Sequence, residues 1–188
     1  MDLVVWAAEE SRARLAPLGS RWLHCRGAAA RAHEIEAVVP PDHRGVLVAA
    51  AYLHDVGYAP ELVRCDFHPL DGAYWLRAQG LDRLAGLVAH HTGASFEAQA
   101  HGLAGELAAF DDEQSPVTDA LAYSDLTTGP TGERVTVAER LGEIERRYGP
   151  TSLVVRALEQ ASDALLGMVA RTEARLVAQP GLRCRIAV

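Results

Sequence analysis

A histidine and a carboxylate stand side by side at the end of the most apolar stretch of the chain. Residues 46–53 are almost all apolar and lead directly into His54 and Asp55. A segment that is apolar on every side is typical of a buried helix, and polar groups at its end lose solvation free energy unless a partner binds them. A metal ion is the usual partner, because imidazole and carboxylate both suit zinc, iron and manganese. Gly57 and Pro60 indicate that the helix ends here.

Other expected helices also carry a metal-ligand type of residue at or near an end. In chain order the candidate ligands are His24, His54, Asp55, His68, His90, His91 and Asp125. His90 and His91 close one apolar helix, and Asp125 closes another. His68 precedes Pro69 at the start of a helix, so a helix-capping role is the alternative for this residue.

The elements that must position these residues are all expected to be helices. The spacing of apolar residues and the turn signals predict helices over about residues 3–16, 20–35, 46–57, 68–79, 82–91, 95–110, 116–125, 136–148 and 152–177. Gly102 and Gly105 weaken the prediction for residues 95–110. No convincing strand-like alternation is present in the sequence. We therefore expect an all-α fold, an orthogonal bundle of about eight or nine helices.

Length and composition indicate one domain. The chain has 188 residues and is 49% hydrophobic, which is enough for a substantial core. We expect a metal-binding core over about residues 20–130, with C-terminal helices over 136–177 packing on it. The last helix is long and apolar enough either to complete the core or to pair between subunits as a homodimer.

Charge and cysteine content exclude several classes of protein. A formal charge of −7 and a pI near 5.6 argue against a protein that binds nucleic acid duplexes or membrane surfaces. All 18 basic residues are arginine, so a single arginine is weak evidence of function. Cys25, Cys65 and Cys184 form no CxxC pair, which favours a reduced compartment and no catalytic role. With no signal peptide or long apolar span, the sequence predicts a cytoplasmic protein.

Three features in this order resemble the HD-domain superfamily of metal-dependent phosphohydrolases. They are a lone histidine followed by small residues at 24–29, the doublet within residues 53–57, and a distant aspartate on a later helix. The resemblance covers roughly residues 20–130. It implies that one divalent ion is bound by His24, His54, Asp55 and Asp125.

The remaining histidines resemble additional positions of family members that hold two metals. His68, in the segment 68–73, and the pair His90 and His91 would then form a second site, with Asp55 bridging the two ions. One histidine of the pair can instead contact the substrate or support a ligand. The expected cofactor is one or two divalent transition metal ions per chain (Fe, Mn, Zn, Co or Ni), with Mg as a further candidate. Of these two stoichiometries, we favour two ions per chain.

One departure from the family pattern concerns the phosphate. Many members have a lysine after the glycine of the doublet motif, and this chain has Tyr58 there. Another residue must then supply the contact to the substrate phosphate. The candidates for substrate binding are Arg26, Arg64 and Thr128, and the sequence does not choose among them.

The resemblance implies a hydrolase that acts on a phosphate ester, such as a nucleotide or another small metabolite. Asp55 and His54 would be catalytic, because a metal-activated hydroxide near Asp55 would attack phosphorus. A di-iron oxygenase acting on a small molecule is the main alternative, since the same superfamily includes such enzymes. A non-catalytic nucleotide-binding sensor is a third, which the intact set of four ligands disfavours.

Overall fold

Helices form the regular secondary structure of residues 2–179, the part of the chain that this computed structural model describes. The ten α-helices of that part are α1 (Leu3–Leu15), α2 (Ser20–Ile35), α3 (Arg44–Leu53), α4 (His68–Ala78), α5 (Asp82–Ala89), α6 (Ala94–His101), α7 (Ala104–Leu107), α8 (Pro116–Leu126), α9 (Val137–Tyr148) and α10 (Leu153–Ala178). Six short 3₁₀ turns and one isolated β-bridge, between Thr128 and Arg134, complete the described structure. The predicted all-α class is confirmed.

The region 95–110 contains two helices where the sequence predicts one. Gly102 ends α6 in the left-handed region, at φ +73°, and its N–H donates to carbonyls of the last turn. Glycine adopts this backbone conformation without the steric cost that a side chain brings. The chain then restarts as α7, which brings the helix count slightly above the expected eight or nine.

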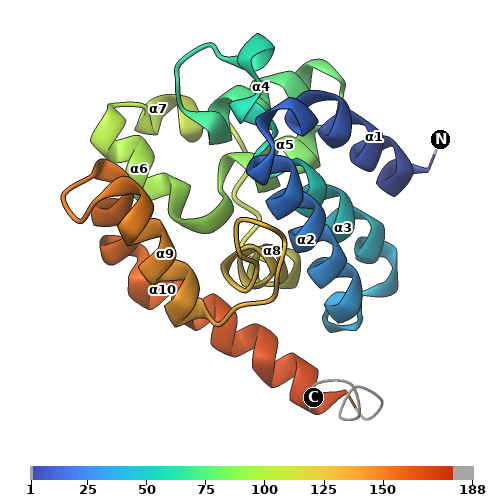
Figure 1. Cartoon of the computed structure of the whole chain (residues 1–188). Coiled ribbons are helices and arrows are strands. Elements are labelled where there is room, and N and C mark those ends of the chain that lie inside the picture. The colour runs from blue at the N-terminus through green and yellow to red at the C-terminus, as the bar shows by residue number, and fades with distance from the viewer. Residues whose placement is uncertain (1, 180–188) are drawn as a thin grey trace.

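Helix α3 is the buried centre of the bundle, as its sequence predicts. It packs against α1, α2, α5 and α8. Buried side chains occur around its circumference, at Leu47, Val48, Ala49, Ala50, Ala51 and Leu53. The polar doublet that follows is therefore held in the interior, and Figure 1 shows α3 beside α2.

The C-terminal helices pack on the part of the bundle that carries the doublet. Helix α10 lies against α8 and α6, and α9 contacts both α8 and α10 (Figure 1). Ala161, Leu165 and Val169 of α10 join the apolar cluster that begins in α1. The last helix thus contributes to the core, while Leu166 and Val177 stay exposed.

Two glycines allow close approaches that set the positions of site residues. A Cβ atom on Gly57 would lie 2.0 Å from the carbonyl oxygen of His68, so only glycine fits where the doublet turn meets α4. A Cβ atom on Gly27 would lie 2.5 Å from the Cα atom of Gly132, where α2 meets the loop after α8. Both approaches bring together segments that are distant in the sequence.

None of the described helices is long and apolar enough to cross a membrane.

Candidate metal centre

Five helices bring six potential ligands into one buried cluster. His24 projects from the middle of α2, and His54 and Asp55 follow the end of α3. His68 begins α4, and the cap position before it belongs to Phe67. The other two members are His91, which follows α5, and Asp125, near the end of α8. His68 is half-buried, and the other five residues are buried.

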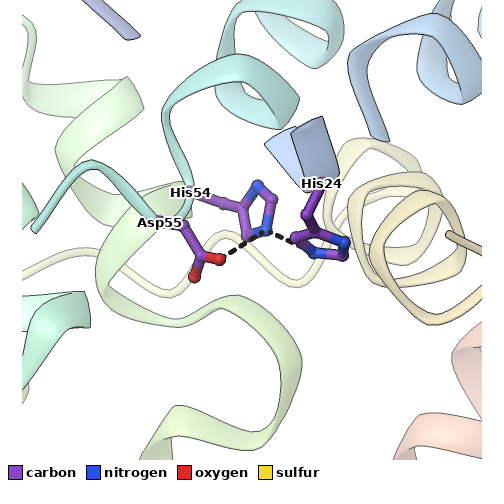
Figure 2. A group of neighbouring side chains, drawn as sticks. All are labelled: His24, His54 and Asp55. Carbon is purple, nitrogen blue, oxygen red and sulfur yellow. Dashed lines mark hydrogen bonds and ion pairs between the residues drawn. The ribbon is translucent and has the colours of Figure 1, made fainter. Parts of the chain in front are cut away.

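The first group in the cluster consists of His24, His54 and Asp55 (Figure 2). The Nε2 atoms of the two histidines are 3.3 Å apart, and Nε2 of His54 is 3.6 Å from Oδ2 of Asp55. Asp125 adjoins this group, with Oδ1 2.9 Å from Nε2 of His24 and 3.9 Å from Nε2 of His54. The four residues that the resemblance assigns to one ion therefore lie together.

The second group consists of Asp55, His68 and His91. Oδ1 of Asp55 is 3.3 Å from Nε2 of His68 and 3.9 Å from Nε2 of His91. The two histidine Nε2 atoms are 3.4 Å apart. Asp55 thus offers one carboxylate oxygen to each group, which is the arrangement of a bridging ligand.

Backbone carbonyls orient three of the four histidine rings. Nδ1 of His24 is 3.2 Å from the carbonyl oxygen of Gly129. The corresponding contacts in the other two rings are 2.9 Å from His54 to Ala51 and 2.6 Å from His91 to Val88. A carbonyl oxygen only accepts hydrogen bonds, so each Nδ1 carries a proton that it donates. In the neutral rings, the lone pair is on Nε2 and faces the cluster.

This donor set fits a metal ion of the kind that imidazole and carboxylate bind. Two neutral rings with lone pairs on facing Nε2 atoms cannot form a hydrogen bond with each other. Nor can such a ring bond to a carboxylate oxygen, which also accepts only. A shared cation satisfies all these atoms together, and three-ligand groups of nitrogen and oxygen suit zinc, iron, manganese and related ions. The described residues could therefore hold a divalent metal in either group.

Thr92 fixes the orientation of Asp125 from a strained backbone position. Its hydroxyl donates a hydrogen bond of 2.6 Å to Oδ2 of Asp125, on the side away from His24. Thr92 adopts φ +37° and ψ +57°, a left-handed conformation that is unfavourable for a β-branched residue. The unfavourable conformation therefore occurs at a residue whose hydroxyl holds a candidate ligand in place.

Two arginines lie next to the carboxylates of the cluster. Nη1 of Arg21 donates to Oδ2 of Asp55 at 2.5 Å. Burial alone would raise the pKa of Asp55, but the Arg21 guanidinium and the adjacent His54 and His68 hold it well below its ordinary value. On the other side, Nη2 of Arg140 is 3.7 Å from Oδ1 of Asp125.

Asp125 and the histidines of the second group also have shifted pKa values. Burial would raise the pKa of Asp125, but the adjacent imidazole of His24, with His54 and Arg140 nearby, lowers it strongly. Burial lowers the pKa of His68 and His91. Anionic carboxylates and neutral imidazoles are the protonation states that bind metal ions.

A small cavity of about 80 Å³ opens beside the cluster. Asp55, His68, His91 and Asp125 line one side of it, and Arg21, Arg140 and Arg147 line the rest together with Tyr58, Tyr148 and apolar side chains of α9 and α10. Arg140 is 5% exposed, and its Nε atom is buried without a hydrogen-bond partner in the described structure. The opening next to the candidate ligands therefore has three guanidinium groups in its lining, beside the carboxylates of Asp55, Asp125 and Glu97.

Four of the predicted site residues lie elsewhere. Nε2 of His90 is 3.0 Å from the carbonyl oxygen of Phe110, and His90 is in neither ligand group. Arg26 is exposed, and exposed Arg64 stacks on Tyr74. Thr128 is buried and donates its hydroxyl to the carbonyl of Ser124. The structure therefore places these four residues away from the cavity beside the cluster.

Sequence reasoning missed three residues that shape the site. Arg21 stands three residues before His24, a spacing that places both on one face of a helix, and this was the available signal. Arg140 is 116 residues from His24, which it contacts at 3.4 Å, so no local pattern could reveal it. Thr92 follows the histidine pair, but its hydrogen bond depends on the turn conformation.

Cys25 and Cys65, the two cysteines among the described residues, are not members of either ligand group. Cys25 is fully buried, and burial raises the pKa of its thiol well above the ordinary value. Burial and the nearby Asp71 raise the pKa of Cys65 to about 11. Both thiols are therefore protonated at neutral pH, while Cys184 lies outside the described residues.

Comparison with known proteins identifies the family. The sequence profile of the HD domain matches residues 21–141, which is more than half of the chain. No curated protein and no solved structure gives a significant match. The matched segment includes all six clustered residues and the two arginines beside them, Arg21 and Arg140. The chain therefore belongs to the HD domain family.

Proposed function

We propose that this protein is a metal-dependent phosphohydrolase that cleaves a phosphate ester at the cluster. The observation that carries the proposal is the cavity lined by candidate metal ligands on one side and by Arg21, Arg140 and Arg147 on the other. Planar guanidinium groups match the oxygens of a phosphate with paired hydrogen bonds. A small opening with guanidinium groups beside candidate metal ligands suits a phosphoryl group.

Arg21 compensates for the family lysine that is missing at position 58. Its guanidinium lies 4.0 Å from the centre of the Tyr58 ring, in a cation–π contact. The Tyr58 ring in turn stacks on His68, with 4.0 Å between ring centres. In our proposal, Arg21 provides the positive charge that position 58 does not, and the Tyr58 ring holds the guanidinium group in place through the cation–π contact.

Each residue of the site has a distinct part in the proposed reaction. A divalent ion bound by these ligands supplies an activated water and charge for the phosphoryl oxygens. Arg21 and Arg140 bind and orient the phosphate, and the unpaired Nε of Arg140 is a donor ready for one of its oxygens. Asp55 and His54 position the reacting groups. Ile144 and Leu158 line the cavity and keep bulk water out.

The experiment combines metal analysis, a phosphatase panel and an oxygen-uptake assay on the purified protein. We expect bound divalent metal, release of inorganic phosphate from at least one ester, and loss of that release on chelation. Oxygen uptake without phosphate release would support the di-iron oxygenase instead. Nucleotide binding with neither reaction would support the sensor.

A matched pair of variants tests the arginine assignment. Arg21→Gln should lower kcat/KM for the ester by about 100-fold, since a charge-assisted contact to phosphate contributes about 3 kcal/mol. Arg26→Gln, on the same helix but exposed and away from the cavity, should leave the rate unchanged. Equal effects of the two changes would contradict the role of Arg21.

A further inference from the structure

A second and larger cavity adjoins the one beside the cluster. Its volume is about 420 Å³, and it lies between the start of α4, the helix α6 and the start of α10. Tyr58, His68, Glu97 and Val154 line both cavities. Nε2 of His68 is also 3.3 Å from Asp55, so the boundary between the two cavities lies directly at the candidate metal ligands.

The two cavities differ in the charged residues that line them. The residues that line the larger one include three carboxylates, Asp66, Asp71 and Glu97, and no arginine. The smaller one contains three arginines beside Glu97 and the two candidate metal ligands Asp55 and Asp125. Because guanidinium groups line the smaller cavity and not the larger one, an anionic group is favoured in the smaller cavity relative to the larger one.

Asp71 has a buried carboxylate oxygen without a partner. This residue is 1% exposed, and its Oδ1 accepts hydrogen bonds from the backbone N–H groups of Arg64 and Cys65. Its Oδ2 is buried and has no hydrogen-bond partner in the described structure. Buried polar atoms of native proteins rarely lack a hydrogen-bond partner, so we expect a ligand in the cavity to donate a hydrogen bond to this oxygen.

Aromatic rings form another part of the wall. Phe67 is 1% exposed and packs against the ring of His101, with 5.6 Å between ring centres. Tyr58 and His68 form a stacked pair at the boundary. A ligand in this cavity thus meets flat apolar surface together with carboxylate acceptors, the combination that suits an organic group carrying hydroxyl or amino donors.

We propose that the larger cavity binds the organic part of the substrate, and that it selects leaving groups that are uncharged or positively charged and carry hydrogen-bond donors. This inference rests on the proposed phosphohydrolase function. The phosphate occupies the arginine-lined cavity, and the ester oxygen lies near His68. The organic group then extends past Tyr58 towards Glu97 and Asp71. Substrates with a second anionic group beyond the ester are rejected.

Three two-carbon phosphate esters of similar size test the selection. Phosphoethanolamine has an ammonium group in the leaving alcohol, ethyl phosphate has none, and phosphoglycolate has a carboxylate. We expect kcat/KM to fall in this order, with about tenfold or more between the first and the last, because like charges in a cavity cost at least about 1.4 kcal/mol. A rate for phosphoglycolate that equals or exceeds the rate for phosphoethanolamine would overturn the proposal.

A matched pair of variants separates the cavity from the intrinsic reactivity of each ester. Glu97→Gln should reduce the preference for phosphoethanolamine over phosphoglycolate several-fold, because it removes a half-buried charge from the wall. Glu106→Gln, at an exposed position of α7 that lines neither cavity, should leave the preference unchanged. The chemistry of the ester bond cancels in this comparison, so equal preferences in the two variants would contradict the assignment.

Saturation-transfer NMR with the free alcohols distinguishes this inference from the function on which it rests. Ethanolamine should give a stronger signal than glycolate, and Glu97→Gln should abolish the difference. This result without hydrolysis of any ester would contradict the proposed function while retaining the selective cavity. Hydrolysis of all three esters at similar rates, with no preference between the alcohols, would retain the function and overturn the selective cavity.

Discussion

The Nε2 atoms of His24 and His54 lie 3.3 Å apart while the Nδ1 atom of each ring faces a backbone carbonyl. The carbonyls of Gly129 and Ala51 thereby direct both lone pairs towards the same point. The distance is too short for two such nitrogens to be favourable neighbours without a cation, because neither has a proton to share. This relationship explains why the cluster is suited to a metal.

The adjacent residues His90 and His91 should differ in their effect on metal content. We expect two divalent ions per chain in wild-type protein prepared with excess metal, as the sequence pattern also favours. His91→Ala should reduce this to one, because it removes a member of the second group, whereas His90→Ala should leave two. Elemental analysis of the three proteins provides the measurement. A single ion in the wild type would exclude the second site.

Asp55→Ala should remove both metal retention and turnover. Asp55 is the residue that both ligand groups share, so neither group keeps its carboxylate in this variant. Metal content and phosphate release are measured on the same preparation. Normal values for both quantities would place the metal elsewhere in the molecule.

Asp125→Asn should weaken metal binding while the helices stay formed. The amide keeps the size of the side chain but removes the charge that adjoins His24 and His54. Far-UV circular dichroism should remain at the wild-type level, and metal competition should show a higher Kd. An unchanged Kd would remove Asp125 from the ligand set.

Thr92→Val should lower metal affinity about 10- to 100-fold, which is the usual effect of losing a group that orients a ligand. Valine keeps the shape and branching of threonine and lacks the hydroxyl that bonds to Asp125. Thr131→Val is the control, since the Thr131 hydroxyl bonds to exposed Glu133. Metal competition on both variants gives the comparison, and similar affinities for the two would contradict the orienting role.

Asp119 should make stability depend on pH in the acid range. Burial alone would raise the pKa of Asp119, but ion pairs with Arg171 and Arg175 of α10 hold it below the ordinary 3.8. A lowered pKa in the folded state means that the stabilisation is complete above about pH 4 and is lost as pH falls further. Asp119→Asn should therefore lower the free energy of unfolding at pH 7. We expect a decrease of about 1–3 kcal/mol, which is less than for a fully buried ion pair because solvent screens the partly exposed arginines.

Chemical denaturation at pH 7 and below pH 4 measures the Asp119 effect. The difference between wild type and Asp119→Asn should shrink as pH falls, and Asp163→Asn, an exposed change on α10, should have little effect at either pH. A constant difference across the range would show that the charge of Asp119 is unimportant.

Local signals were enough to predict which residues gather in the cluster, because these residues stand at recognisable places in the helix pattern. The apolar run of α3 and the turn at Gly57 are enough to identify His54 and Asp55 from the sequence alone, and the fold brings them together with His24 and Asp125. The all-α class followed from the same periodicity. These features depend on residues close in sequence, which a pattern can reveal.

The anion-binding side of the cavity could not be predicted in the same way. Arg21 and Arg140 reach the cluster from helices whose approach is decided by packing across the bundle. Since every basic residue in the chain is arginine, composition could not distinguish them from Arg26 or Arg64. The choice between His90 and His91 likewise depends on the direction of the chain at the end of α5, which the sequence leaves open.

His24 and Asp125 stand 101 residues apart in the chain yet make direct contact. An ion held by both would act as a covalent cross-link does, closing a loop that includes most of the bundle. By the chain-entropy argument used for disulfides, closing a loop of this size lowers the conformational entropy of the unfolded chain, which stabilises the folded state by about 4–5 kcal/mol. Metal supply would then control how long the protein survives proteases in the cell, independently of its part in the chemistry.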